Sequence, residues 1–248
     1  MRPEFSEREF EFCFNAEFIR KNASAVIGTP FIPSQRLEAL LGFDVEFKLR
    51  QGNIQHSLFL QHKVSHFIQN QAGKNWGIYN FHMGPYYYFY LEKLDRSRQH
   101  NLLHNLRQSG EEVYYSAPLF FERNVFTQHF VNEVVIDNSV FIDPSGVGLI
   151  MDLDLHKISY NQNGTQAAFH SEIKKIEKVI NFAFLKEKLV RKRIDEQYFS
   201  KLFSSLKKGV NDIFRVEFEL PKKYVELPLI SQCAYLLRRY YKLQWVMF

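Results

Sequence analysis

The chain has 248 residues, of which 46% are hydrophobic, 24% charged and 16% aromatic, a composition typical of a globular protein with a Phe-rich core. No apolar run approaches the roughly 18 residues of a membrane-spanning helix, and the first residues lack the apolar stretch of a secretory signal, so neither is expected. Cys13 and Cys233 are far apart in the sequence. Both lie in apolar helical patterns, so we expect both to be reduced core residues of a cytoplasmic protein, and two cysteines cannot make a zinc site by themselves.

The net charge of +5 is unevenly distributed along the chain. Residues 170–248 hold 17 Lys and Arg against 9 Asp and Glu, whereas the rest of the chain holds 15 against 18. This basic C-terminal third indicates a nucleic acid or an acidic protein partner, or simply a solvated helix face. The densest basic run lies on an expected helix and could contact phosphates. It comprises Lys186, Lys188, Arg191, Lys192 and Arg193.

The first expected element is a helix from Glu7 to about Lys21. Ser6 and Glu9 have the spacing of a capping box, and apolar residues recur at helical spacing after them. Glycine and proline then predict a loop over residues 22–35, with a short strand at 25–27, and a short helix over 35–41. Later elements follow from the same signals. We expect strands at 85–91, 113–121, 131–143, 156–160 and 214–220, helices at 97–108, 171–208 and 229–242, and an irregular stretch at 67–85.

A β-hairpin is the clearest local pattern. Two alternating segments flank Gly52-Asn53, which predicts a two-residue type II′ turn. With that turn, Gln51 faces Ile54 and Asp44 faces Gln61. One face of the hairpin is then almost entirely apolar, and it holds Phe43, Val45, Phe47, Leu49, Leu58, Leu60, His62 and Val64.

The other face of the hairpin gathers Asp44, Glu46, Gln61 and Lys63. Directly opposed residues lie roughly 5 Å apart and diagonal ones roughly 7–8 Å apart, so Asp44 and Gln61 could share one cation, with Lys63 diagonal to Asp44. A cross-strand surface salt bridge is the alternative. The second strand is apolar, however, which indicates a central strand, and a buried Lys beside carboxylates must be paired or functional.

The pattern of these residues resembles that of the PD-(D/E)xK nuclease superfamily. Gly42-Phe43-Asp44 followed by Gln61-His62-Lys63 is similar to the G-x-D and Q-x-K motifs of Mrr-type restriction endonucleases. The resemblance covers roughly residues 6–121. The chain departs from the simplest family pattern because no Pro precedes Asp44, Gln61 replaces Glu, and residues 67–91 are additional. Because an amide binds a hard cation less strongly than a carboxylate, other acidic residues are of interest.

Two carboxylates could compensate for Gln61. Glu17 falls on the apolar stripe of the first helix, and the resemblance implies an acidic residue from that helix near the metal; an ion pair with Arg20 or Lys21 is the alternative. Glu46 shares the Asp44 face, or pairs with Lys48 or Arg50.

One further polar residue follows the hairpin. Gln99 begins the next helix, where some relatives in the superfamily place a Gln near the metal and where a helix N-terminus favours phosphate; capping is the alternative.

We therefore expect an α+β protein with a restriction-endonuclease-like core, a mixed sheet flanked by helices, over residues 1–160. A basic, mostly helical region over 161–248 would bind nucleic acid or a protein partner. The resemblance implies Mg²⁺- or Mn²⁺-dependent hydrolysis of nucleic-acid phosphodiesters, with DNA as the expected substrate and restriction or anti-phage defence as the expected role. Asp44, Gln61 and Glu17 would hold the metal, and Lys63 would activate the attacking water. The alternatives are an inactive nuclease-like assembly module and a protein-interaction scaffold.

Overall fold

The computed structural model describes residues 1–51, 54–70, 76–170, 174–191 and parts of the chain beyond 200, namely 200, 203–204, 206–208, 210–211, 219–225, 232–233 and 235–236. Its first two elements confirm the sequence prediction. α1 spans Glu7–Lys21 and begins with the expected capping box, in which the Ser6 hydroxyl accepts the Glu9 N–H and the Glu9 carboxylate accepts the Ser6 N–H. α2 spans Gln35–Leu41 and ends at Gly42.

Sheet A is a mixed five-stranded sheet with the order β1-β2-β5-β6-β10. β1 and β2 are antiparallel, and Gln51 pairs with Ile54 as the sequence predicted, although the turn residues 52–53 lie outside the described part of the chain. β2 runs parallel to β5, and the remaining pairs are antiparallel. The strands span Val45–Gln51, Ile54–His62, Glu112–Pro118, Ser139–Ile142 and Val179–Ile180.

Sheet B is antiparallel, with five strands in the order β3-β4-β7-β8-β9. These strands span His66–Ile68, Tyr86–Tyr90, Lys157–Asn161, Ala167–His170 and Lys174–Ile176. The expected strands near 85–91 and 156–160 are confirmed, whereas β3 and α3 (Trp76–Phe81) fall in a stretch expected to be irregular. Residue 160, the expected boundary between two regions, lies inside β7. Strands after it belong to both sheets, since β8 pairs with β7 in sheet B and β10 pairs with β6 in sheet A.

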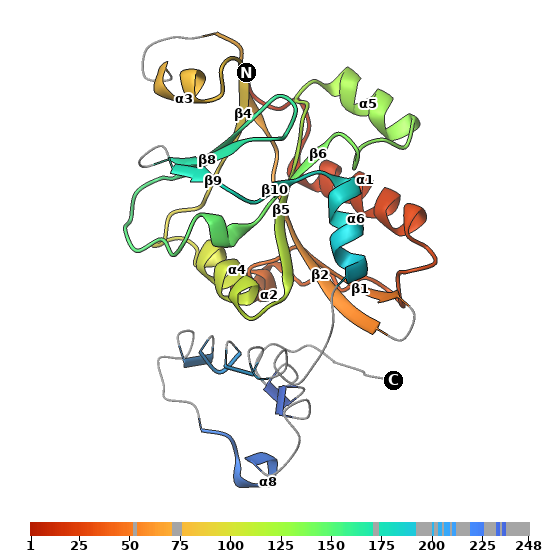
Figure 1. Cartoon of the computed structure of the whole chain (residues 1–248), viewed down its shortest axis with the longest axis vertical. Coiled ribbons are helices and arrows are strands. Elements are labelled where there is room, and N and C mark those ends of the chain that lie inside the picture. Colours follow the sequence, from red (N-terminus) through yellow and green to blue (C-terminus); the bar gives the residue numbers. More distant parts are fainter. Residues whose placement is uncertain are drawn as a thin grey trace.

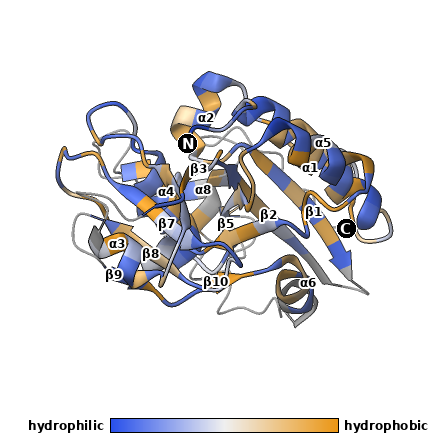
Figure 2. Ribbon diagram, turned by 90° about the horizontal axis from the view of Figure 1, so that it is seen from above, coloured by the Kyte–Doolittle hydropathy of each residue, from blue (hydrophilic) through white to orange (hydrophobic). Residues whose placement is uncertain are grey.

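Sheet A is covered on both faces. One face packs against sheet B, and the core between them includes Phe59, Phe89 and Tyr160. α2 and α4 (Gln99–Gln108) contribute Leu41 and Leu103 to the same core. The other face packs against α1, α5 (Arg123–Val131) and α6 (Phe182–Arg191), as Figure 1 shows. Apolar residues follow the strands between these layers in Figure 2. The α+β class and the mixed sheet flanked by helices are therefore as predicted.

One residue of the hairpin differs from the predicted pattern. Val45, Phe47, Leu58 and Leu60 lie together against α1, as expected. Phe43 instead packs against Phe59 on the opposite face, with ring centroids 4.9 Å apart. The reason is that β1 begins only at Val45, so strand alternation does not extend back to Phe43.

Two expected elements are wrong. In place of a strand over 131–143, α5 ends at Val131 and β6 is confined to Ser139–Ile142. In place of a helix from residue 171, β9 and β10 occupy Lys174–Ile176 and Val179–Ile180, and α6 follows. The apolar spacing in the latter region also fits helices, but the edges of β8 and β6 offer backbone hydrogen bonds that the local sequence cannot reveal.

The last part of the chain is described only in pieces. Leu206, Val210, Cys233 and Leu236 form a small buried cluster, and α8 spans Lys222–Val225. The expected strand at 214–220 and helix at 229–242 lie mostly outside the described residues. No helix in the part of the chain that the structure describes is long and apolar enough to cross a membrane.

Candidate active site

Asp44 and Gln61 lie side by side at one end of the β1–β2 pair. The Gln61 Nε2 atom donates to both carboxylate oxygens of Asp44 at 2.9 and 2.8 Å, and the His62 N–H donates to Asp44 Oδ2 at 2.7 Å. A backbone bond from Asp44 N–H to Leu60 O, 2.9 Å long, ties Asp44 to β2 one residue out of the hairpin register, in which Leu60 pairs with Val45. Both side chains are buried. The juxtaposition that the sequence predicted is present.

Lys63 and Gln99 extend this pair into a network. Gln99 Nε2 donates to Gln61 Oε1 at 2.9 Å and to Glu38 Oε1 at 3.2 Å, while Lys63 Nζ donates to Gln99 Oε1 at 3.4 Å. Gln99 is the first residue of α4, and its own N–H donates to the Ser97 hydroxyl at 3.1 Å. Gln99 therefore lies with the hairpin residues, linked by its side chain rather than by its helix terminus alone.

A set of carboxylates surrounds Lys63. The Glu7 carboxylate lies 3.8 Å from Lys63 Nζ. Burial raises the pKa of Asp44 to about 8 against the attraction of Lys63, and Glu38 and Glu7 raise it further. Partial burial also raises the pKa of Glu7 and of Glu11, and Glu38 adds to both shifts. The site thus places carboxyl groups near one lysine where burial disfavours their ionisation, and a bound cation would offset that cost.

Glu7 and Glu38 were not among the residues that the sequence indicated. Glu7 appeared only as the first residue of a helix and Glu38 as part of a short one. Only the packing of α1 against the hairpin, which the local sequence does not show, places Glu7 at the site. The Phe10 and Phe14 rings contact the His62 ring, with centroids 5.7 and 5.0 Å apart, so the first turn of α1 lies beside Lys63.

Glu17 does not belong to this network, so its expected role as metal ligand is not supported by its contacts. Its carboxylate accepts the Val135 N–H at 2.9 Å and the Ile136 N–H at 3.4 Å, and pairs with Lys21 at 3.0 Å. Ten residues of α-helix separate it from Glu7, about 15 Å along the axis. The alternative interpretation, an ion pair with Lys21, is the one observed. A carboxylate on an apolar stripe here binds the loop between α5 and β6.

Glu46 lies on the expected face but has its own partner. Its carboxylate accepts the Ser57 hydroxyl at 2.6 Å, and its backbone pairs with Phe31 outside the hairpin. Burial raises the pKa of Glu46, while Ser57 and Lys48 oppose the shift. Two residues of strand place it about 7 Å from Asp44. Its contacts are therefore those of a neighbour of the site rather than a member.

Gly42 connects α2 to the site. It has a φ of +85°, and a Cβ atom there would lie 2.9 Å from both the Gln99 carbonyl oxygen and Leu102 Cβ. We expect Gly42→Ala to lower the free energy of unfolding by about 2–3 kcal/mol, from a strained backbone and a forced displacement of α4. Urea denaturation measures this. Gly28→Ala is the matched control, because Gly28 has a φ of +67° but nothing within 4 Å of such a Cβ. Equal losses of stability in both variants would mean that the close approach of Gly42 to α4 contributes nothing to the effect.

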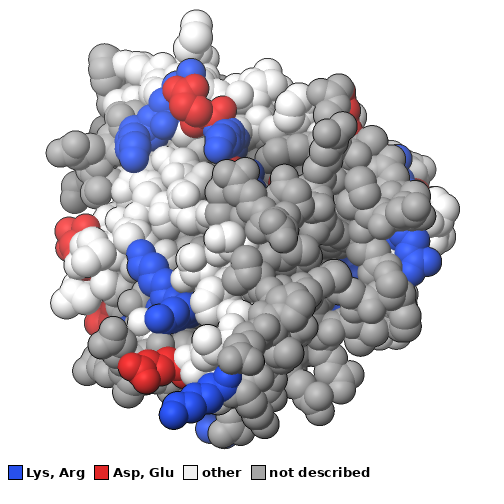
Figure 3. Space-filling model, turned by 60° about the horizontal axis from the view of Figure 1, so that its bottom comes forward, with Lys and Arg blue, Asp and Glu red and all other residues white. Residues whose placement is uncertain are grey.

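The basic residues are distributed differently from the acidic ones. Lys186 is exposed on α6 with its Nζ 5.7 Å from the Phe182 ring centroid. Lys188 and Arg191 belong to the same helix, and Lys192 and Arg193 lie outside the described residues. On the face shown in Figure 3, the described basic side chains form several separate groups, some beside acidic ones.

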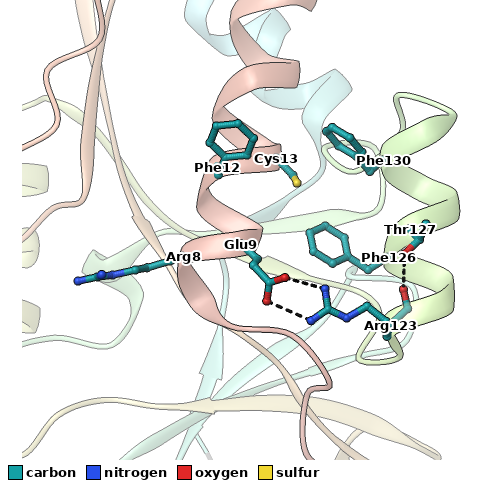
Figure 4. A pocket seen from close by; sticks show the side chains of 8 residues that line it. All are labelled: Arg8, Glu9, Phe12, Cys13, Arg123, Phe126, Thr127 and Phe130. Carbon is teal, nitrogen blue, oxygen red and sulfur yellow. Dashed lines mark hydrogen bonds and ion pairs between the residues drawn. The ribbon is translucent and has the colours of Figure 1, made fainter.

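Two hollows adjoin the elements of the site. One, of ≈ 390 Å³, is lined partly by Ala39, Arg96 and Arg98, which neighbour Glu38 and Gln99 in sequence. The other, of ≈ 410 Å³, lies between α1 and α5 and contains the Glu9–Arg123 ion pair beneath three phenylalanine rings (Figure 4). Its residues are distinct from the Asp44 network. The lining of the first hollow includes Arg98, the residue directly before Gln99.

The donor set is small for a metal. Among the described residues, no three His, Cys, Asp or Glu side chains are grouped so as to hold an ion. Mg²⁺, however, is commonly bound through one or two carboxylates with water completing its shell. Asp44 offers a buried carboxylate, and Gln61 Oε1 could join it if the amide turned over. These residues fit a hydrated Mg²⁺ or Mn²⁺, with Gln61 as the weaker ligand.

Comparison with known proteins adds no relative to this description. Neither the protein-family models nor the curated proteins nor the solved structures gave a match to the chain.

Proposed function

We propose that this protein is a metal-dependent nuclease with a core of the PD-(D/E)xK type. The observation that carries the proposal is the single hydrogen-bonded network of Asp44, Gln61, Gln99 and Lys63 at the end of β1 and β2. The acidic residue and the Q-x-K pair are the elements by which the chain resembles this superfamily. The parallel β2–β5 pair in a mixed sheet is consistent with such a core.

Asp44 and Gln61 would hold Mg²⁺ or Mn²⁺. When bound, the metal would polarise the scissile phosphate and stabilise the leaving oxygen. Gln61 Nε2 now faces Asp44, so its amide must turn over to present Oε1. Gln99 can follow the same turn, since it bonds Gln61 through Nε2 and Lys63 through Oε1. This exchange would release the Lys63 ammonium from Gln99.

Lys63 would then act on the reacting groups. The Lys63 side chain is 12% exposed and its Nζ lies between Gln99 and Glu7, so the ammonium can reach a phosphate oxygen or the attacking water. The ammonium would orient that water and offset negative charge in the transition state. Arg96 and Arg98 would contact the nucleic-acid backbone from the adjoining hollow. DNA is the proposed substrate, and restriction or defence against foreign DNA the proposed setting.

Lys63→Ala is expected to lower Mg²⁺-dependent cleavage of DNA about a hundredfold or more, because it removes the cation that acts on the transition state. Gel assays with single- and double-stranded DNA and RNA, with and without EDTA, measure the rate. Lys175→Ala is the control, since Lys175 is exposed and pairs with Glu177 at 3.5 Å. Equal cleavage by wild type and Lys63→Ala would contradict the proposal.

A nuclease-like assembly module without catalysis is the second candidate. One observation favours it: the Asp44 oxygens are already satisfied by Gln61 and the His62 N–H. Such a closed network is stable without a cation. Isothermal titration with Mn²⁺ separates the candidates, because the nuclease binds the ion with loss of affinity in Asp44→Asn. The module binds none and cleaves none of the four nucleic acids.

A further inference from the structure

The outer face of sheet B carries a cluster of exposed rings. His66 on β3 stacks on Tyr88 of β4 with centroids 5.0 Å apart and an interplanar angle of 20°. Tyr90 lies two residues farther along β4, edge-on to Tyr88 at 5.4 Å and 5.7 Å from His66. Alternation places Tyr87 and Phe89 in the core instead. These three rings, His66, Tyr88 and Tyr90, are called the aromatic platform below.

The aromatic platform is open to ligands. Tyr90 is 43% exposed, and His66 and Tyr88 are half-buried. The turn after α3 borders the platform on this face of sheet B, where His82 contacts the hydroxyl of Ser159, the β7 residue paired with Tyr88, at 2.6 Å. Tyr90, the most exposed of the three rings, is therefore the one that a ligand contacts most readily.

Positive charge borders the platform. Lys157 on β7 lies beside Tyr90 in the sheet, and its Nζ is 5.3 Å from the Tyr88 ring centroid. Arg2 acts electrostatically on both His66 and Tyr88. Exposed rings next to basic side chains on an antiparallel sheet are the components by which proteins bind unpaired nucleotides, since bases stack and phosphates are neutralised.

The aromatic platform is continuous with the candidate active site. β3 begins three residues after Lys63, a reach of about 10 Å at most. The Val64 backbone hydrogen-bonds to Glu7, and Glu92, two residues beyond Tyr90, acts electrostatically on the same carboxylate. Both strands of the platform therefore lead to the residues around Lys63.

We propose that the aromatic platform binds an unpaired nucleic-acid strand and directs it to Lys63, which makes single-stranded nucleic acid, or the unpaired end of a duplex, the substrate class. The inference rests on the proposed nuclease function for its last step only. Binding to the platform itself requires no metal.

The test is fluorescence anisotropy of the full chain in EDTA, which prevents cleavage. The probes are labelled oligothymidylate and oligouridylate of about 12 nucleotides, within the site size of known stacking folds, and a duplex of the same length. We expect oligothymidylate or oligouridylate to bind more tightly than the duplex. Tyr90→Ala should weaken this binding at least about fivefold and Tyr90→Phe by less than about twofold, since stacking needs the ring and not the hydroxyl.

Phe130→Ala is the matched control, because Phe130 is 42% exposed on α5, away from sheet B. Lys157→Gln should lower the salt dependence of binding by about one counterion. Tighter binding of the duplex, unchanged binding by Tyr90→Ala, or an equal loss in Phe130→Ala overturns the platform. Binding as expected without any cleavage in Mg²⁺ overturns the nuclease proposal alone, whereas cleavage with Tyr90-independent binding overturns the platform alone.

Discussion

Asp44→Asn is expected to unfold at a higher urea concentration than the wild type at pH 8, although it abolishes metal-dependent cleavage. The cause is the environment of the carboxylate. Burial raises the pKa of Asp44 to about 8, with Glu38 and Glu7 adding to the shift, because ionised Asp44 is poorly solvated in this site. An amide of the same shape has no charge to bury. Its oxygen still accepts the His62 N–H, and the Gln61 amide can turn over to accept from its NH₂ group.

The pH dependence has a defined direction. Below its ordinary pKa of 3.8, Asp44 is protonated in both the folded and the unfolded chain. As the pH rises toward about 8, the unfolded chain loses this proton while the folded chain keeps it, so the stability of the wild type falls. The advantage of Asp44→Asn should therefore grow from near pH 4 to about pH 8 and then stay constant, at a few kcal/mol. Urea denaturation at a series of pH values measures this difference.

The effect of Mg²⁺ on stability tests the role of Asp44 in a second way. If the ion binds ionised Asp44, it should raise the stability of the wild type at pH 8 more than at pH 6 and leave Asp44→Asn unaffected. Asp154→Asn is the control, because Asp154 is exposed. A wild type and an Asp44→Asn variant with parallel stability curves across the pH range would contradict the assigned pKa.

The centre of the site was predictable because its spacing is local. Residues 42–64 form a hairpin whose register follows from one turn, and the observed pairs from Val45 with Leu60 to Gln51 with Ile54 obey it. Strand alternation accounts for Gln61 and Lys63 lying on one side. Asp44 precedes β1 and joins them through its hydrogen bonds to Leu60, Gln61 and His62. The first two helices were equally accessible because a capping box and Gly42 mark where they begin and end.

The periphery of the site could not be predicted from the sequence. Glu7 and Glu38 reach it only through the packing of α1 and α2, and neither helix carries a local sign of its position. For Glu17 the error was the reverse, because the sequence suggested a place in the site that the residue does not have. A carboxylate on an apolar stripe must have partners, but two backbone N–H groups 118 and 119 residues away satisfy it as well as a metal would.

Glu17→Ala is accordingly expected to destabilise the fold severely and to leave cleavage per folded molecule unchanged. The Glu17 side chain is fully buried and accepts the Val135 and Ile136 N–H groups, both of which would lose their acceptor. Val135 and Ile136 are both fully buried, so solvent does not reach their N–H groups to replace the carboxylate. The expected loss is about 3–5 kcal/mol in the free energy of unfolding, measured by urea denaturation. Lys21 keeps a partner in Asp137 at 2.5 Å, so the loss arises mainly from the backbone groups.

Glu17→Gln separates hydrogen bonding from charge, because the amide retains an acceptor oxygen for Val135 but loses the ion pair with Lys21. Its loss should be smaller than that of Glu17→Ala. Glu177→Ala should cost less than about 1 kcal/mol, since Glu177 and Lys175 form an exposed pair. If Glu17→Ala instead folded with wild-type stability and lost Mn²⁺ binding, Glu17 would be a metal ligand after all. The carboxylate that α1 supplies to the site would then be Glu17 and not Glu7.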